Sequence, residues 1–193
     1  MARIAGTSVR GKLLQSAAVL FYRDGIAATG IDAIIAHAGV AKQSLYNNFA
    51  SKADLVSAYV RARHDEWLEL YAKREAAAHT PRAKVLAVFE AYEDHAELAH
   101  DCGFRGCGLL NAASELVAGD PGRLAVRDHK AEVEAILAAH LAKMAPGDGA
   151  GVARLARHLS FLLEGAITRA GLEGDSAAVA EAKAMAARMV DAP

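Results

Sequence analysis

The chain of 193 residues lacks most of the features that mark membrane, secreted or disulfide-rich proteins. No apolar run approaches the ~20 residues that a transmembrane helix needs, so we expect no membrane span. The first residues show no apolar stretch after their charges, so we expect no secretory signal. Two cysteines, Cys102 and Cys107, are too few for a disulfide scaffold. Together these absences predict a cytoplasmic protein.

Proline and strand-forming residues are also scarce. The chain has 4 prolines and only 6% aromatic residues, while alanine is abundant. Alanine, leucine, glutamate, lysine and arginine are the best helix formers. Apolar residues make up 53% of the chain and charged residues 23%, which is typical of a globular protein. The composition therefore predicts an all-α protein of one or two small domains.

Capping residues, glycines and apolar residues at a spacing of three to four divide the chain into about nine helices. Residues 29–32 and 51–54 have the form of capping boxes, with Thr29 and Ser51 as the capping residues. The predicted helices cover residues 8–24, 30–38, 41–49, 51–77, 81–99, 105–118, 121–144, 150–172 and 176–191.

Charge is divided unevenly along the chain. The formal net charge is only −1, yet residues 1–64 contain eight basic and three acidic side chains, and the remainder contains 14 and 20. A basic N-terminal module on an acidic body is expected when only one end of a protein meets phosphate. Many solvated surfaces show a similar bias, so this division supports a nucleic-acid partner without establishing one.

Residues 29–55 carry the most informative pattern. Two helices of about two turns each flank Gly39, which is the spacing of a helix-turn-helix and a residue that tolerates the positive φ of so tight a turn. The second helix has an outer face of hydrogen-bonding residues, and no acid occurs between Ala33 and Ala53. Such side chains suit base edges and phosphates. We therefore predict a DNA-reading helix; the alternative is a polar surface helix in an ordinary bundle.

The segment and its surroundings carry a further set of residues at characteristic positions. They are Ala18, Phe21, Gly25, Thr29, Ala38, Gly39, Val40, Leu45, Tyr46, Phe49 and Lys52. With these residues the segment resembles the DNA-binding domain of the TetR family over about residues 8–60. Ala41 replaces a frequent serine cap of that family, at a cost of about 1 kcal/mol, and Asn48 replaces a common histidine. Beyond the segment, the chain matches the family only in helix pattern and length.

The resemblance implies a sequence-specific transcriptional regulator, expected to be a repressor that a small molecule releases from a palindromic operator. It implies a helix-turn-helix domain at residues 1–60 and a helical ligand-binding and dimerisation domain at 61–193. Alternatives remain for single residues, since Thr29 as a cap, Tyr46 as packing or Lys52 as a solvated charge would also fit. The implied phosphate contacts are Thr29, Lys42, Tyr46 and Lys52, and the residues implied at or beside base edges are Gln43, Ser44, Asn47 and Asn48.

The resemblance also implies a small-molecule pocket formed by the fifth to seventh helices. Aromatic residues mixed with a few polar groups suit a mostly apolar ligand with one hydrogen-bonding end. The alternative is that these aromatics are simply core, and the sequence does not identify the effector. The candidate pocket residues are Trp67, Tyr71, Phe89, Tyr92, His95, Phe104, Cys107, Asn111, His129, Phe161 and Glu164.

A homodimer through the last two helices is a further implication. A monomer core would also explain the apolar stripes on these helices. A dimer would place two recognition helices about 34 Å apart on a near-palindromic operator. The stripes are Val152, Leu155, Leu159, Leu162, Leu163 and Ala166 on the first of the two helices, and Ala177, Ala180, Ala184, Ala187 and Val190 on the second.

Two other functions remain as alternatives. Cys102 and Cys107, with His95, His100 and His129, suggest a metal or thiol sensor, but their spacing is unusual for zinc and buried cysteine is commonly inert. An enzyme would need a recognisable motif, and the chain has no phosphate-binding glycine loop, nucleophile elbow or H-E-x-x-H pattern. We therefore predict a regulator that is not an enzyme and needs neither metal nor cofactor.

Overall fold

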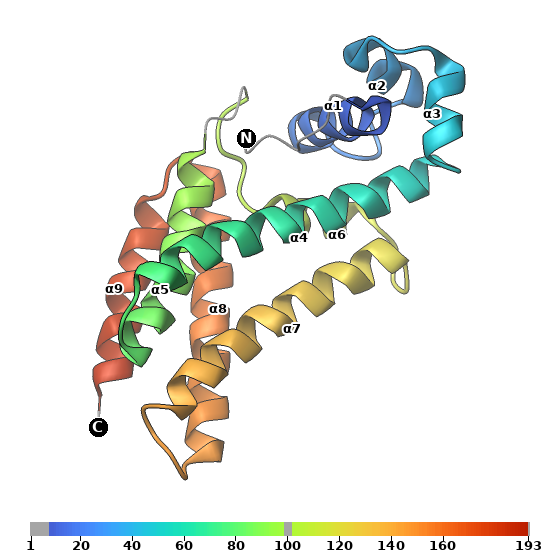
Figure 1. The fold of residues 1–193 in the computed structure, drawn as a ribbon. Helices are drawn as coiled ribbons and strands as arrows, with labels where there is room; N and C mark the ends of the chain where they lie inside the picture. Colours follow the sequence, from blue (N-terminus) through green and yellow to red (C-terminus); the bar gives the residue numbers. More distant parts are fainter. Residues whose placement is uncertain (1–7, 99–101, 193) are drawn as a thin grey trace. The chain divides into compact units, whose positions relative to one another are not determined.

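The computed structural model describes residues 8–98 and 102–192. Over these residues the protein is all-α as predicted, with nine helices and no strand (Figure 1). No helix in this part of the chain is both long and apolar enough to cross a bilayer. The helices are α1 Val9–Asp24, α2 Ile31–Ala38, α3 Lys42–Asn48, α4 Lys52–Ala77, α5 Pro81–Glu97, α6 Gly108–Glu115, α7 Pro121–Ala142, α8 Gly149–Glu173 and α9 Ala177–Asp191.

Most predicted helix ends lie within a few residues of the observed ones, but α6 is shorter than its predicted range. Gly106, inside the predicted range, has a φ of 82°, which is incompatible with a right-handed helix, so α6 begins only at Gly108. The capping box at Ser51 is confirmed, since its Oγ accepts the Asp54 N–H at 3.1 Å. The capping box at Thr29 is wrong, because Gly30 occupies the N-cap of α2 and no side chain caps that helix.

The chain forms two compact units. The first comprises the described part of Met1–Asp65 together with Gly108–Val126, and the second comprises Glu66–Cys107 and Arg127–Pro193. Helices α4 and α7 each continue from one unit into the other. The first unit thus includes α6, which the sequence did not indicate. The division of function at residue 60 stays a prediction.

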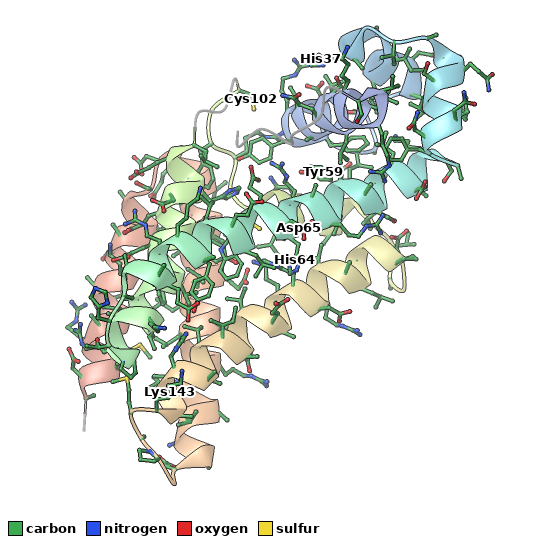
Figure 2. The ribbon with its side chains drawn as sticks, viewed as in Figure 1. His37, Tyr59, His64, Asp65, Cys102 and Lys143 are labelled. Carbon is green, nitrogen blue, oxygen red and sulfur yellow. The ribbon has the colours of Figure 1, made fainter. Side chains whose placement is uncertain are left out.

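The core of the first unit holds α1, α2 and α3 together. Ile34 and Leu45 are 0% exposed and Phe49 is 1% exposed, so both short helices contribute their apolar side to one core. Tyr59 on α4, labelled in Figure 2, meets the Phe21 ring edge-on at a centroid distance of 5.5 Å. This packing gives two helices of eight and seven residues a defined place that their length alone would not provide.

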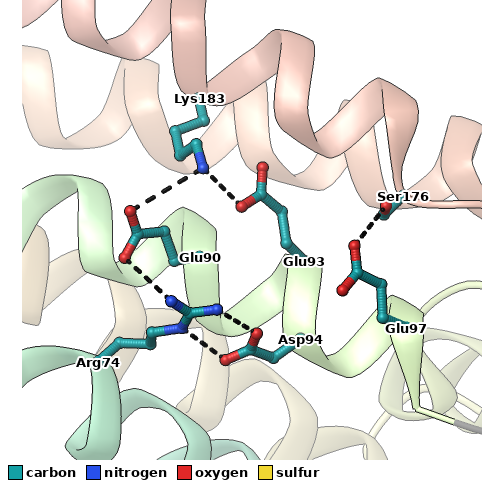
Figure 3. Close-up of polar contacts among 7 residues, drawn as sticks. All are labelled: Arg74, Glu90, Glu93, Asp94, Glu97, Ser176 and Lys183. Carbon is teal, nitrogen blue, oxygen red and sulfur yellow. Dashed lines mark hydrogen bonds and ion pairs between the residues drawn. The ribbon is translucent and has the colours of Figure 1, made fainter.

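In the second unit α5, α8 and α9 lie side by side (Figure 1). A polar network joins α4, α5 and α9, as Figure 3 shows. Arg74 binds both carboxylate oxygens of Asp94, and its Nε lies 2.7 Å from Asp94 Oδ2. Lys183 Nζ donates to Glu93 Oε2 at 2.6 Å and lies 3.9 Å from Glu90 Oε1. These ion pairs are only partly buried, and solvent screening keeps the contribution of each one small, so we interpret the network mainly as fixing the register of three helices.

Candidate functional site

The turn between α2 and α3 is the tight one that the sequence predicts. Gly39 adopts φ 62° and ψ 38°, in the left-handed region. Its N–H donates to Ala36 O at 3.2 Å, and the Val40 N–H donates to Ile35 O at 3.3 Å, so the last carbonyls of α2 are satisfied. Any other residue would adopt this conformation at a cost of about 1–2 kcal/mol. Gly39 therefore sets the angle at which α3 leaves α2.

The outward face of α3 is centred on two amides. Each helical residue turns by about 100°, so Gln43 and Asn47 lie opposite the buried Leu45. Both amides are exposed, and Gln43 Nε2 donates to Asn47 Oδ1 at 3.1 Å. Each amide can make further hydrogen bonds, since an amide side chain has two donors and two acceptor sites. The pair is thus held side by side in a form that suits an adenine edge.

One flank of this face carries a phenol and a cation. Tyr46 is 50% exposed, and Lys42 Nζ binds Asp32 Oδ1 on α2 at 2.9 Å. The hydrogen bond to Asp32 is the main cause of the raised pKa of Lys42, and the carboxylate charge adds to it. The sequence did not indicate this partner. A phosphate at Lys42 would have to compete with Asp32 for the ammonium group.

The other flank is half-buried. Asn48 Nδ2 donates to the Ser44 carbonyl at 2.7 Å, so part of its hydrogen-bonding capacity is used within α3. Lys52 begins α4 directly after the loop and is half-buried. A guanidinium also lies near the end of α3, with Arg10 Cζ 4.7 Å from the centroid of the buried Phe49 ring. The structure therefore brings seven of the eight predicted DNA contacts to α3 or the start of α4, and their contact with DNA stays a prediction.

Thr29 is the exception. Its side chain is 3% exposed, and its hydroxyl donates to Gly25 O at 2.6 Å, with Leu20 O at 3.3 Å. The hydroxyl is thus engaged with the end of α1 rather than with the N-terminus of α2. This burial argues against a phosphate contact through the Thr29 hydroxyl.

A second candidate site lies in the other unit, around Trp67. The Trp67 ring stacks on Tyr71 at 5.5 Å, lies 5.4 Å from Tyr92 and meets His129 edge-on at 5.3 Å. All four side chains are at most 6% exposed. The structure therefore brings these four pocket candidates together in one buried aromatic cluster.

Lys130 joins this cluster to polar groups. Its Nζ lies 2.9 Å from Glu164 Oε1, 3.3 Å from the Tyr92 hydroxyl and 3.8 Å from Cys107 Sγ. Burial acts to lower the pKa of Lys130, but Cys107, Tyr92 and Glu164 act in the opposite direction and the net pKa is raised. Lys130 is therefore a charged group that is only 16% exposed. The sequence analysis missed it, because lysine is usually a surface residue and nothing local marks this one.

Several polar atoms around this cluster are buried without a hydrogen-bond partner in the described part of the chain. Two of them are Trp67 Nε1, a donor, and Glu164 Oε2, an acceptor. Buried polar atoms in native proteins are nearly always paired with protein, water or ligand. The two atoms are therefore candidates for hydrogen bonds to water or to a bound molecule.

The remaining pocket candidates are dispersed. Phe89 is 0% exposed in the core, and His95 meets Phe104 edge-on at 6.1 Å. Asn111 belongs to α6 and therefore to the first unit. Phe161 does not join the cluster: it is 65% exposed, because the neighbouring Ser160 and Leu163 take the inward side of α8.

The two cysteines lie in different surroundings. Cys107 is buried, whereas Cys102, labelled in Figure 2, is half-buried with its Sγ 3.6 Å from Gly103 O. His100 lies outside the described residues. Within the described ranges, no three histidine, cysteine, aspartate or glutamate side chains are grouped so that they could hold a metal ion.

His140 makes stability depend on pH. Its Nε2 lies 2.8 Å from the Tyr71 hydroxyl, and burial, assisted by Lys143 and Lys84 and opposed by Glu75, lowers its pKa from the ordinary 6.5. Below pH 6.5 the unfolded chain therefore binds more protons than the folded one. We expect the free energy of unfolding to fall as the pH drops through this range, by up to about 1.4 kcal/mol per pH unit. Urea titrations at several pH values between 5 and 8 will show that the free energy of unfolding depends less steeply on pH in His140→Gln than in the wild type. An unchanged dependence on pH would contradict this assignment.

Comparison with known proteins agrees with the geometry of the first unit. The family profile described as bacterial regulatory proteins, tetR family, matches residues 13–59. The transcriptional repressor KstR2 of Mycobacterium tuberculosis is 36% identical over 101 residues, which is 49% of this chain and 50% of the relative. That match thus spans about half the length of the curated relative.

Solved structures extend the similarity over the whole chain. A TetR-family transcriptional regulator from Streptomyces coelicolor is 31% identical and has a TM-score of 0.83, with 94% of this chain and 93% of that chain covered. A TetR transcriptional regulator from Chloroflexus aurantiacus is 26% identical, with a TM-score of 0.79 and the same coverage. With its helix-turn-helix, the nine helices of its described residues and this similarity along nearly its full length, the chain belongs to the TetR family of bacterial regulatory proteins.

Proposed function

We propose that this protein is a DNA-binding transcriptional repressor that acts in the cytoplasm as a homodimer and releases its operator when a small molecule binds. The observation that carries the proposal is the acid-free, amide-centred face of α3 behind the Gly39 turn. Residues 1–60 form the DNA-binding domain in this proposal, and residues 61–193 form the effector-binding and dimerisation domain.

The DNA contacts divide into two kinds. Gln43, Ser44 and Asn47 read base edges in the major groove, while Lys42, Tyr46 and Lys52 hold phosphates on either side. Phosphate contacts give affinity and base contacts give specificity. The same face would suit a basic or neutral partner badly, because amides in the middle and cations at the margin match the pattern of a groove between two phosphate strands.

The effector site in this proposal is the cluster of Trp67, Tyr92 and Lys130. The aromatic rings suit a flat apolar ligand, and the unpaired atoms of Trp67 and Glu164 add an acceptor and a donor requirement. A ligand that binds one conformation of the protein more tightly shifts the population toward it. Release follows when that conformation binds the operator less well.

The dimer surface in this proposal is the exposed side of α8 and α9. A groove of about 670 Å³ lies there between Phe161, Gly165, Ala178 and Met185. Of the two predicted stripes, the first is largely internal, with Leu159 at 0% and Leu163 at 1% exposed, which agrees with the alternative of a monomer core. The second stripe is open: Ala177, Ala180 and Ala184 are exposed.

We expect Phe161→Asp to weaken the dimer. Phe161 is 65% exposed, and a helix partner that covers it would have to bury a carboxylate in the variant. Loss of the burial of one phenylalanine side chain alone is about 1.5–3 kcal/mol, so the dimer dissociation constant should rise by about tenfold or more. Sedimentation equilibrium of the 20.2 kDa chain measures this shift. Val117→Asp, at a 74% exposed position in the other unit, is the control and should sediment like the wild type.

Selection of bound duplexes from a random-sequence pool by the purified protein tests the function itself. We expect enrichment of one palindromic site whose half-sites lie about one helical turn or a multiple of it apart. Binding that is equally strong to all duplexes would contradict sequence-specific recognition. A single unpaired half-site would contradict the dimeric mode.

A further inference from the structure

Glu115, the last residue of α6, accepts two hydrogen bonds from the turn that leads into the helix-turn-helix. Its Oε1 accepts the Ile26 N–H at 2.9 Å, and its Oε2 accepts the Ala27 N–H at 2.7 Å. The residues are 89 and 88 positions apart in the chain, yet all belong to the first unit. Hydrogen bonds to an ionised carboxylate are roughly twice as strong as neutral ones. One side chain thus satisfies two consecutive backbone donors.

The absence of a side chain at Gly25 leaves space for the Glu115 carboxylate. It adopts φ 92°, and a Cβ placed there would lie 2.9 Å from Glu115 Oε1. The position therefore excludes a side chain for two reasons, the backbone angle and the space that the carboxylate occupies. The Gly25 N–H donates to Phe21 O at 3.1 Å, so the turn begins directly at the last turn of α1.

The same turn is also held from the side of α2. The Thr29 hydroxyl donates to Gly25 O, while α2 itself begins at Ile31 without a side-chain cap. The start of α2 therefore depends on the turn rather than on a cap of its own. Helix α2 in turn directs α3 through Gly39 and through the pair of Asp32 with Lys42.

We propose that Glu115 is a positioning residue for DNA recognition: by holding the backbone at Ile26 and Ala27 it sets the orientation of α2 and α3 and makes α6 part of the DNA-reading unit. The inference rests on the proposed function. A displacement of the end of α6 would move the turn, because the two hydrogen bonds leave it little independent freedom. Glu115 itself makes no contact with DNA in this proposal.

Two variants test the role. Glu115→Ala removes both acceptors, and Glu115→Gln keeps one carbonyl oxygen but turns an amide NH₂ toward the other N–H. We expect Glu115→Ala to weaken binding to the duplex selected by the wild type by about tenfold or more, and Glu115→Gln to fall between the two. Glu69→Ala, at an exposed glutamate of α4, is the matched control and should bind like the wild type.

A purely structural role is distinguished by two further readouts. Partial unfolding would weaken binding to selected and scrambled duplexes in the same proportion, whereas mispositioning leaves binding to the scrambled duplex within about twofold of the wild type. The slope of log affinity against log salt should stay unchanged, since no phosphate contact is lost. If Glu115→Ala binds the selected duplex as the wild type does, or loses both duplexes equally, the proposal is overturned.

Amide hydrogen exchange tests the two hydrogen bonds of Glu115 in the absence of DNA. We expect the Ile26 and Ala27 amides to exchange faster in both Glu115 variants, while the core amides of α1 remain protected. Unchanged exchange at these two amides would overturn the proposal even if the protein proved to have no operator. Failure of the wild type to select any DNA would instead overturn the proposed function, so the two failures are distinguishable.

Discussion

Replacing Gln43 and Asn47 together by alanine is expected to weaken binding to the selected operator by about 100-fold or more, because each bidentate base contact contributes about 1–3 kcal/mol. Both amides lie opposite the buried Leu45 and already hold one another through a 3.1 Å hydrogen bond. Their removal deletes base readout but leaves Lys42, Tyr46 and Lys52 in place. The loss should therefore be confined to specific binding.

Fluorescence anisotropy with the selected duplex and with a scrambled one measures this effect. Binding to the scrambled duplex should change by less than about threefold, since phosphate contacts dominate non-specific affinity. Gln15→Ala, at an exposed glutamine of α1, is the matched control. Equal losses on both duplexes would mean that the amides serve affinity rather than readout. No loss on either would remove α3 from the interface.

Replacing Lys130 by methionine is expected to destabilise the fold by about 3 kcal/mol or more, because it leaves the Glu164 carboxylate largely buried without its cation. Glu164 is 28% exposed, and one of its oxygens already lacks a partner in the described part of the chain. The Tyr92 hydroxyl would lose a charged donor at the same time. The expected loss of stability exceeds the net contribution of the ion pair to folding, because the variant leaves the Glu164 charge uncompensated.

Urea unfolding of three variants separates these contributions. We expect the double variant Lys130→Met with Glu164→Gln to recover about 1 kcal/mol or more of the loss, since it removes the stranded charge. Lys73→Met, at an exposed lysine of α4, should unfold within about 0.5 kcal/mol of the wild type. If the single Lys130 variant is as stable as this control, the ion pair is not a structural element of the second unit.

The two halves of the molecule differ in how far the sequence predicts them. In the first unit, most helix ends, the Gly39 turn and the polar side of α3 were predictable, because each depends on residues within a few positions of one another; the ends of α6 were not. The Thr29 cap was the local error: its hydroxyl turns back to the carbonyls of Gly25 and Leu20, and Gly30 takes the cap position. A capping pattern shows only that a side chain is able to cap a helix. Thr29 instead is buried and donates its hydrogen bond to the end of α1.

In the second unit the aromatic cluster was predictable as a set of residues but not as an arrangement. Tryptophan, tyrosine and histidine at helical spacing indicate an inward face, and Trp67, Tyr92 and His129 do meet. Lys130 was not predictable in this way, since a lysine in a helix is usually solvated and its place next to His129 gives no sign of its contacts. Phe161 was predicted to line the pocket but is 65% exposed, because an exposed aromatic residue on a helix has the same sequence pattern as a buried one.

The sequence by itself determined that the chain is helical, where most of its helices begin and end to within a few residues, and that α3 has a face suited to DNA, because these properties follow from caps, glycines and a period of 3.6 residues. Only the tertiary structure decided which distant groups meet. The carboxylate of Glu115 on the amides of Ile26 and Ala27, and the ammonium of Lys130 beside Glu164, join segments that no local rule connects. Such contacts depend on how whole helices pack, and packing is a property of the assembled core.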